Sequence, residues 1–177
     1  MRAPSAVLHR RDEAVDLLRH LLVGELGPVD RVADALLATA PESPDVRRRG
    51  RAMLNVGEED FLLVYLGYLY PQKRVETLLK AFALVSERRV QAKLAIVGGV
   101  LEGYEDYAAR LRDLPAELGI DHNVRWAGPF AWDSTDGSTM LRAADAFAMP
   151  INAGVALNNS SIGASASHGL PLVATGD

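Results

Sequence analysis

A lysine and a run of small polar residues are the groups best suited to bind a ligand. Lys73 stands where a helix is expected to begin, and because a cation there opposes the helix dipole, a bound anion would explain its placement. The polar run feeds a later expected helix and contains Gly154, Asn158, Asn159, Ser160 and Ser161. Its N–H groups and side-chain donors would suit a diphosphate. The alternatives are an exposed loop lysine and a capped helix after a flexible loop.

Three other loops carry residues that could line a ligand pocket. They follow the first, second and third strand-like segments and contribute Tyr68, Gly98, Gly99, Gly128 and Pro129. Glycine lets the backbone come close to a ligand, although a plain turn uses it just as readily. We therefore treat these five residues as candidate lining of the same pocket.

The sequence lacks the motifs of several common catalytic and metal sites. It has no cysteine, which excludes disulfides, thiolate zinc sites and cysteine nucleophiles. No two of its 4 histidines stand four residues apart with a carboxylate, so we expect no metal site. His168 is interpreted as a cation at a helix C-terminus rather than as a general base. Because no nucleophile elbow and no Gly-Lys-Ser/Thr phosphate loop occurs, serine hydrolysis and ATP hydrolysis are poor hypotheses.

Composition and charge indicate an ordinary globular protein. The 177 residues are 49% hydrophobic and carry a net charge of −4, which argues against a nucleic-acid partner. The basic cluster at residues 47–51 is predicted to be a solvated helix face. The longest apolar run, residues 61–70, is about half of what a transmembrane helix needs. Since the N-terminus has no apolar signal stretch, a cytoplasmic location is the default expectation.

Strand-like and helix-like segments alternate from about residue 60 onward. Apolar runs that end at glycine or proline predict strands at residues 61–66, 94–97, 124–127, 146–149 and 172–174. Helical spacing of apolar residues predicts helices at 75–85, 104–118, 140–144 and from 160 or 161 to about 168. This alternation predicts an α/β fold with a doubly wound, mostly parallel, Rossmann-like sheet. Such sheets bind ligands at the carboxyl ends of their strands, where all the candidate residues lie.

The N-terminal part of the chain has a different pattern. No strand is evident before residue 59, and apolar residues recur at helical spacing. Ser43 and Pro44 form a good helix start, with a capping serine and a proline at the first helical position. We therefore expect a helical arm and linker at 1–58 and the sheet domain at 59–177.

Several short sequence blocks carry a family resemblance through their order and spacing. They are LGYLYPQK at 66–73, LLKAF at 78–82, LAIVGG at 94–99, LGI at 118–120, VRWAG at 124–128, LRAADAF at 141–147 and HGLPLVAT at 168–175. Together they resemble the donor-binding C-terminal domain of GT-B-fold glycosyltransferases, the large group 1 family, in its family four-like branch. The resemblance covers residues from about 60 to 175.

The resemblance implies roles for the candidate residues. Lys73 matches the lysine that grips the donor diphosphate, whereas Tyr68 stands at the position of the partner arginine. Asn158 and Asn159 stand where one branch of the family has two arginines, and Ala164 stands at the position of a common glutamate. The loss of each charged contact is expected to weaken donor binding by about 1.5–3 kcal/mol.

The same resemblance implies the donor-binding half of a glycosyltransferase. The donor would be a nucleoside-diphosphate sugar, the acceptor is unknown, and no metal or other cofactor is expected. Because a short helical arm cannot form the acceptor-binding N-terminal domain of such an enzyme, we expect that this partner domain is missing and that the chain is inactive alone. Because the sequence stops at Gly176 and Asp177, directly after a strand where the family continues, we also expect a C-terminal truncation. The alternative is a degenerate, non-catalytic domain that acts in protein interaction or only binds nucleotide. A phosphoacceptor receiver domain is disfavoured, because the first strand ends in Gly67 and Tyr68 rather than in an acidic cluster.

Overall fold

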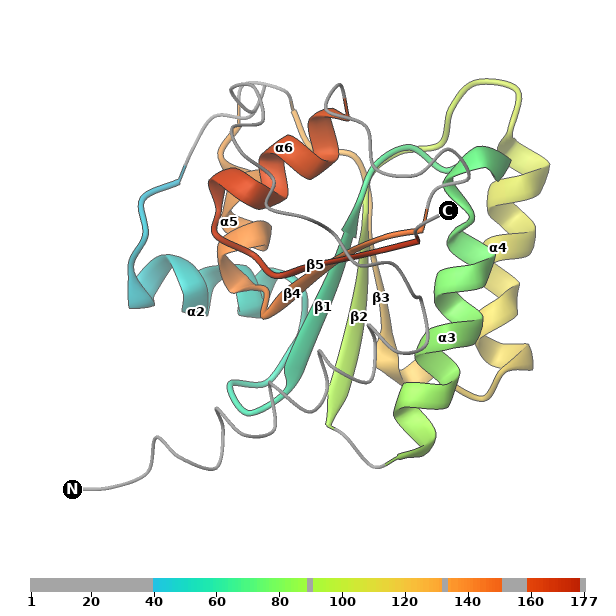
Figure 1. Cartoon of the computed structure of the whole chain (residues 1–177), viewed down its shortest axis with the longest axis horizontal. Coiled ribbons are helices and arrows are strands. Elements are labelled where there is room, and N and C mark those ends of the chain that lie inside the picture. The colour runs from blue at the N-terminus through green and yellow to red at the C-terminus, as the bar shows by residue number, and fades with distance from the viewer. Residues whose placement is uncertain (1–39, 89–90, 132–133, 151–158, 176–177) are drawn as a thin grey trace.

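Five parallel strands form the centre of the fold (Figure 1). The structure is a computed structural model that describes residues 40–88, 91–131, 134–150 and 159–175. The strands are β1 (Phe61–Leu66), β2 (Ala92–Val97), β3 (Val124–Ala127), β4 (Ala146–Met149) and β5 (Leu172–Ala174). They lie in the order β3-β2-β1-β4-β5, and every neighbouring pair is parallel.

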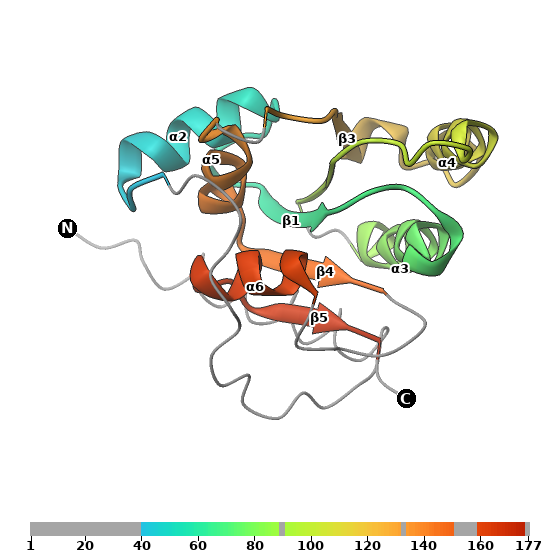
Figure 2. The ribbon, with the colours of Figure 1, turned by 90° about the horizontal axis from the view of Figure 1, so that it is seen from above.

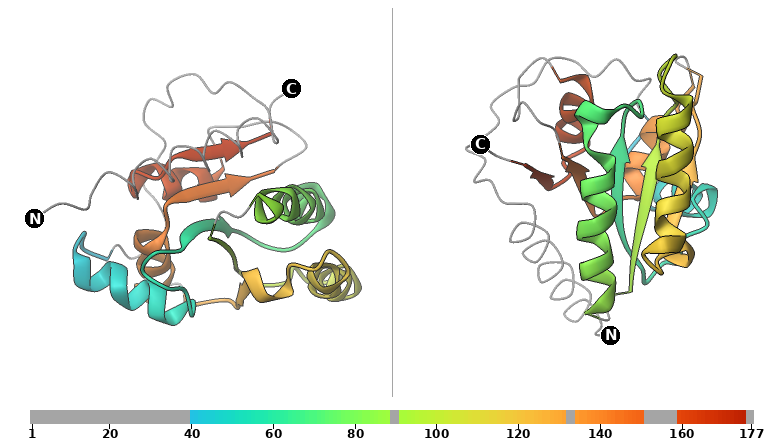
Figure 3. Two further views of the ribbon diagram at one scale, coloured as in Figure 1. Left: turned by 90° about the horizontal axis from the view of Figure 1, so that it is seen from below. Right: turned by 90° about the vertical axis from the view of Figure 1, so that its right-hand side faces the viewer.

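Helices cover both faces of this sheet. The helices that follow β1 and β2, α3 (Val75–Glu87) and α4 (Glu105–Glu117), lie on one face (Figures 2 and 3). The opposite face carries α5 (Asp136–Ala143) and α6 (Ser160–Ser167), and α2 (Pro44–Met53) packs against α5. This arrangement confirms the predicted doubly wound, Rossmann-like sheet.

The central strands are apolar along their whole length because both of their faces are covered. All six residues of β1 and all four of β4 are buried, as expected for parallel strands between two helical layers. β2 begins two residues before the predicted strand, at Ala92. The prediction missed this start because Lys93 is charged; in the structure its ammonium donates to the side chain of Asn123 (2.7 Å).

The helix start predicted at Ser43 and Pro44 is confirmed. The Ser43 hydroxyl accepts a hydrogen bond from the Val46 N–H (3.2 Å), which satisfies one of the free donors of α2. A Cβ atom on Gly50 would lie 2.3 Å from the Thr139 carbonyl oxygen, so the backbones of α2 and α5 approach closely at this glycine. Helix α2 is therefore packed on the sheet domain, while residues 1–39 of the predicted arm lie outside the described residues.

The expectation that residues 47–51 form a solvated face is wrong for part of the cluster. Arg48 and Arg49 are exposed, but Arg51 is completely buried. Arg47 donates to the buried carboxylate of Asp145 (2.7 Å). Since Arg47 and Arg51 are four residues apart, they share the face of α2 that points inward.

Candidate functional site

The candidate loops meet at the carboxyl edge of the sheet. The strand order reverses between β1 and β4, and ligands of doubly wound sheets bind at this switch point. The position that a Cβ on Gly67 would occupy is 3.7 Å from the hydroxyl oxygen of Ser161. The loop that leaves β1 therefore lies beside the start of α6 (Figure 1).

Lys73 lies at this edge, just before the N-terminus of α3. It closes the short 3₁₀ turn η1 (Pro71–Lys73), and its ammonium lies 5.8 Å from the centre of the Tyr70 ring. Partial burial lowers the pKa of the Lys73 ammonium. Within the described part of the chain no carboxylate lies within 4.0 Å of it. A bound anion would offset this desolvation.

The N-terminus of α6 is already partly capped by the protein itself. The Asn159 side-chain oxygen accepts from the N–H groups of Ser161 (3.2 Å) and Ile162 (3.4 Å). These two donors are therefore engaged, whereas the hydroxyls of Ser160 and Ser161 have no hydrogen-bond partner within the described residues. The predicted residues Gly154 and Asn158 lie outside the described residues.

The other predicted pocket residues lie along the same edge, toward β3. A Cβ on Gly99 would lie 3.5 Å from the Cβ of Pro129 and 3.6 Å from Cε1 of Tyr68. The structure thus brings Tyr68, Gly99 and Pro129 together from three different loops. Gly128 is exposed, and a Cβ there would have no atom within 4 Å. Gly98 lies directly against the backbone of Gly67.

Sequence reasoning missed the role of the tyrosines around this edge. The Tyr65 hydroxyl, buried at the end of β1, donates to the backbone carbonyl of Tyr68 (3.0 Å). Burial raises the pKa of the Tyr65 phenol, so it remains a donor. The rings of Tyr70 and Tyr104 lie 6.1 Å apart, and the Tyr107 hydroxyl donates to Glu76. All 5 tyrosines of the sequence lie at positions 65–107, a clustering that could have been noticed.

His168 is a buried link between helices rather than the cation that was predicted. The Ala40 N–H donates to the Ser138 hydroxyl (2.8 Å), which donates to Nε2 of His168 (2.6 Å). Nδ1 donates to the Ala164 carbonyl (2.7 Å). Because a carbonyl can only accept, Nδ1 carries a proton, and in the neutral ring Nε2 accepts from the Ser138 hydroxyl. Burial, and to a smaller extent the charge of Arg142, lowers the pKa of His168, although the Ala164 carbonyl opposes this.

Acidification should therefore destabilise the protein through His168. The unfolded chain takes up a proton on this imidazole near its ordinary pKa of 6.5, while the folded chain resists it. Stability should fall as the pH drops below about 7 toward the lowered pKa, by at most about 1.4 kcal/mol per pH unit. Urea unfolding at several pH values, compared between the wild type and His168→Gln, measures this. Equal pH slopes for the two proteins would refute the assignment.

Two kinds of feature are absent from the described residues. Among residues 40–88, 91–131, 134–150 and 159–175, no group of three or more His, Asp or Glu side chains could hold a metal ion. Over the same part of the chain, no helix is long and apolar enough to cross a membrane.

Comparison with known sequences identifies relatives. The profile of the family described as "Glycosyl transferases group 1" matches residues 46–173. A D-inositol 3-phosphate glycosyltransferase of Saccharomonospora viridis is 30% identical over 131 residues, which cover 68% of this chain and 30% of that protein. One of Corynebacterium efficiens is 28% identical over 146 residues, covering 81% of this chain and 34% of that protein. The chain thus spans about a third of the length of these curated relatives.

Comparison with solved structures agrees with the sequence relatives. Anabaena HepE, solved in complex with UDP-glucose, is 26% identical with a TM-score of 0.63, covering 75% of this chain and 34% of that one. The C-terminal domain of the group 1 protein LpcC from Francisella tularensis has a TM-score of 0.63 at 13% identity. The match covers 80% of this chain and 69% of that one. The second similarity supports the fold alone. Because the family profile matches most of the chain and the sheet matches these structures, this chain belongs to the glycosyl transferases group 1 family.

Proposed function

We propose that this chain is the donor-binding half of a glycosyltransferase that transfers a sugar from a nucleoside-diphosphate sugar. The observation that carries the proposal is the convergence of the Lys73 loop and the start of α6 at the switch point of a group 1 fold. The structure of HepE with UDP-glucose and the names of the curated relatives support a nucleotide-sugar donor. The acceptor and the residues that bind it are left open by the proposal.

In this proposal the protein itself stabilises the leaving diphosphate. Lys73 contributes a positive charge, and the positive end of the α6 dipole, with the Ser160 and Ser161 hydroxyls, contributes donors that need little reorganisation. As the donor bond breaks, negative charge grows on the phosphate oxygen next to these groups. We propose that no metal ion or further cofactor is needed for this step.

A second candidate function is nucleotide binding without transfer. Two observations favour it: Asn159 uses its side-chain oxygen to cap α6, and Ala164 is buried where the family commonly has a glutamate. Neither residue can supply the charge that the family places there. If the intact gene product binds a nucleotide sugar but shows no sugar transfer or donor hydrolysis, this second function is favoured; measurable turnover excludes it.

The direct test of the proposed function is calorimetric titration of the folded chain with UDP-, GDP- and ADP-sugars. We expect one nucleotide class to bind, with free UDP, GDP or ADP binding comparably because the diphosphate is shared. A folded protein that binds none of these ligands would contradict both the transferase function and the alternative of nucleotide binding.

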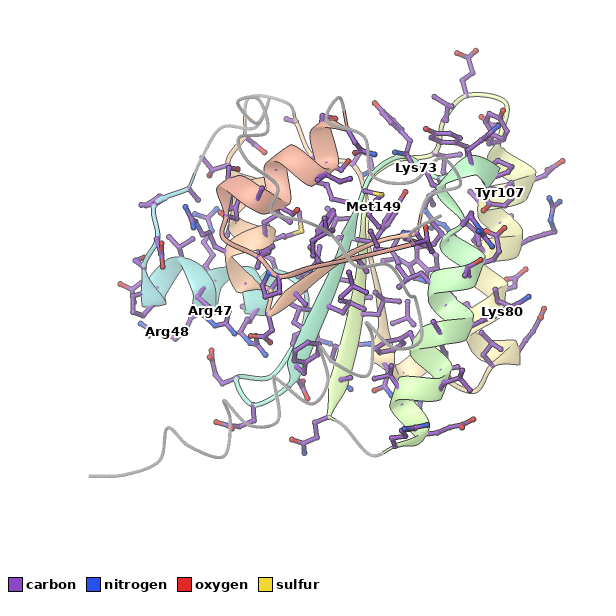
Figure 4. All side chains as sticks on the ribbon, viewed as in Figure 1. Arg47, Arg48, Lys73, Lys80, Tyr107 and Met149 are labelled. Atoms are coloured by element: carbon purple, nitrogen blue, oxygen red, sulfur yellow. The ribbon has the colours of Figure 1, made fainter. Side chains whose placement is uncertain are left out.

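Lys73→Ala should weaken binding of the nucleotide sugar by about tenfold or more. A hydrogen bond to a charged group is worth about 1.5–3 kcal/mol, and 1.4 kcal/mol is a factor of about ten. Lys80→Ala is the matched control, because Lys80 is an exposed lysine on the outer part of α3, away from this edge (Figure 4). Calorimetry should show unchanged affinity for the control. If both variants bind the nucleotide sugar with equal affinity, Lys73 does not contribute to the binding site.

A further inference from the structure

Tyr68 is an exposed aromatic side chain on a backbone that is fixed from both sides. It is 57% exposed, more than the other large hydrophobic residues on the described surface, Met53, Leu84 and Leu101. Its carbonyl accepts from the buried Tyr65 hydroxyl (3.0 Å), and the next N–H, of Leu69, donates to the Gly99 carbonyl (3.0 Å). Single exposed apolar residues are common, but an aromatic ring on such a firmly held loop is pre-organised for contact.

The position of the ring relates it to the proposed diphosphate site. The edge of the Tyr68 ring formed by Cδ1 and Cε1 lies against Gly99, next to Pro129, while more than half of the Tyr68 residue is exposed. The preceding residue, Gly67, lies beside the Ser161 hydroxyl at the start of α6. In the loop that follows β1, Gly67 therefore lies on the side of the α6 N-terminus, and the next residue, Tyr68, lies on the side of the loops after β2 and β3.

We propose that Tyr68 provides the surface on which the nucleobase of the donor stacks. The inference rests on the proposed function, because it needs a nucleotide whose diphosphate lies near Lys73 and α6. A neutral phenol cannot replace a cation opposite phosphate, but its ring can stack on any base, since every base has a π-face. Tyr68 thus shifts part of the binding free energy from the diphosphate to the base.

Tyr65 acts as a positioning residue in this arrangement. Its hydroxyl donates to the Tyr68 carbonyl, and its side chain is completely buried at the end of β1. Tyr65→Phe keeps the ring in the core and removes only this hydrogen bond. We expect the variant to bind UDP a few times more weakly, by about two- to fivefold, with pyrophosphate binding unchanged.

The test separates the base from the diphosphate. Calorimetry of the full chain with UDP and with pyrophosphate is compared for wild type, Tyr68→Ala and Tyr68→Phe. Tyr68→Ala should weaken UDP binding by about fivefold or more while changing pyrophosphate binding by less than about twofold. Tyr68→Phe should bind both ligands like the wild type. Leu101→Ala is the matched control for loss of an exposed apolar side chain from a neighbouring loop.

The outcomes distinguish failure of this inference from failure of the proposed function. Far-ultraviolet circular dichroism and the urea midpoint verify that each variant is folded. If the wild type binds UDP and Tyr68→Ala binds it equally well, or loses UDP and pyrophosphate to the same extent, base stacking on Tyr68 is overturned while the donor site stands. If the folded wild type binds none of UDP, GDP, ADP and pyrophosphate, the donor site itself is overturned and the stacking role with it.

Discussion

Replacing Arg51 with alanine is expected to lower the free energy of unfolding by about 3–5 kcal/mol. The Arg51 side chain is fully buried. Its guanidinium donates to the carbonyl of Gly57 through Nε (3.0 Å), to that of Ala143 through Nη1 (3.0 Å), and to that of Asp60. Alanine would leave the buried Ala143 carbonyl without its donor, at a cost of about 1–3 kcal/mol, and would also remove the contacts to the partly buried carbonyls of Gly57 and Asp60.

The same guanidinium lies 3.6 Å from a carboxylate that organises the start of two strands. This is the buried carboxylate of Asp145, which lies just before β4 and faces Arg51. It accepts hydrogen bonds from the Arg47 guanidinium (2.7 Å) and from the Leu62 N–H in β1 (2.8 Å). Burial lowers the pKa of the Arg51 guanidinium, and the negative charge of Asp145 opposes this shift. Arg51 therefore joins α2 to β1 and β4, and its loss leaves Asp145 with less compensation.

Arg48→Ala is the matched control for this substitution. It removes an arginine from the same helix, but Arg48 is exposed, and its ion-pair partner among the described residues is the exposed Asp45. Such surface pairs contribute about 0–1 kcal/mol. Urea unfolding followed by far-ultraviolet circular dichroism should therefore show a large shift of the midpoint for Arg51→Ala and a small one for Arg48→Ala. Similar midpoints for the two variants would contradict a structural role for the buried guanidinium.

The sheet could be predicted from the sequence because its strands are buried on both faces. β1, for example, is a continuous apolar run of six residues between polar residues and a glycine, and its short length and the glycine favour a buried strand over a buried helix. Helix α5 was predicted only from residue 140, whereas it begins at Asp136. Its first turn contains Gly137, Ser138 and Thr139, poor helix formers that are buried here by tertiary packing.

The buried polar groups could not be predicted, because their partners are distant in the sequence. Arg51 is stabilised by carbonyls in two other segments and faces Asp145, and His168 needs the hydroxyl of Ser138. Burying such groups is favourable only when these partners are in place. Local charge patterns do not reveal such partners, which is why Arg51 was assigned to a solvated helix face and His168 was interpreted as a cation at a helix C-terminus.

The location of the candidate site follows from the topology, but its details do not. Any doubly wound sheet brings the loops after β1 and β4 to one edge, so Lys73 and the start of α6 could be placed there. The hydrogen bonds by which Asn159 caps α6, and the packing of Tyr68 against Gly99, depend on side-chain orientations that no periodicity encodes. Within the described residues, two N–H donors at the start of α6 are therefore already engaged by Asn159, which the sequence did not indicate.

Gly98→Ala is expected to destabilise the protein by about 3 kcal/mol or more, and to weaken nucleotide binding in the molecules that still fold. A Cβ at this position would lie 2.2 Å from the carbonyl oxygen and 2.9 Å from the carbonyl carbon of Gly67. These are backbone atoms, so the overlap is relieved only by moving the chain. Gly98 also has a φ of +139°, a conformation that residues with a side chain rarely adopt.

The close approach of Gly98 to Gly67 lies where hydrogen bonds hold the carboxyl ends of β1, β2 and β3 together. The Gly67 N–H donates to the Val97 carbonyl (2.9 Å), and the Gly98 N–H donates to the Ala127 carbonyl (3.0 Å). A methyl group between the two glycines would push the β1 loop away from β2, and with it the backbone that reaches Ser161. The cost in stability and the loss of nucleotide affinity should therefore appear in the same variant.

Gly128→Ala provides the control, because it adds the same methyl group to the next loop along the sheet. A Cβ there would have no neighbour within 4 Å, and the residue is exposed with no positive φ. Its stability should change by less than about 0.5 kcal/mol, with a small gain from the stiffer unfolded chain. Urea midpoints of both variants measure the difference in stability, and a UDP titration of Gly98→Ala is compared with the wild type. If Gly98→Ala has the midpoint of Gly128→Ala and the UDP affinity of the wild type, the contact between Gly67 and Gly98 does not hold the carboxyl edge together.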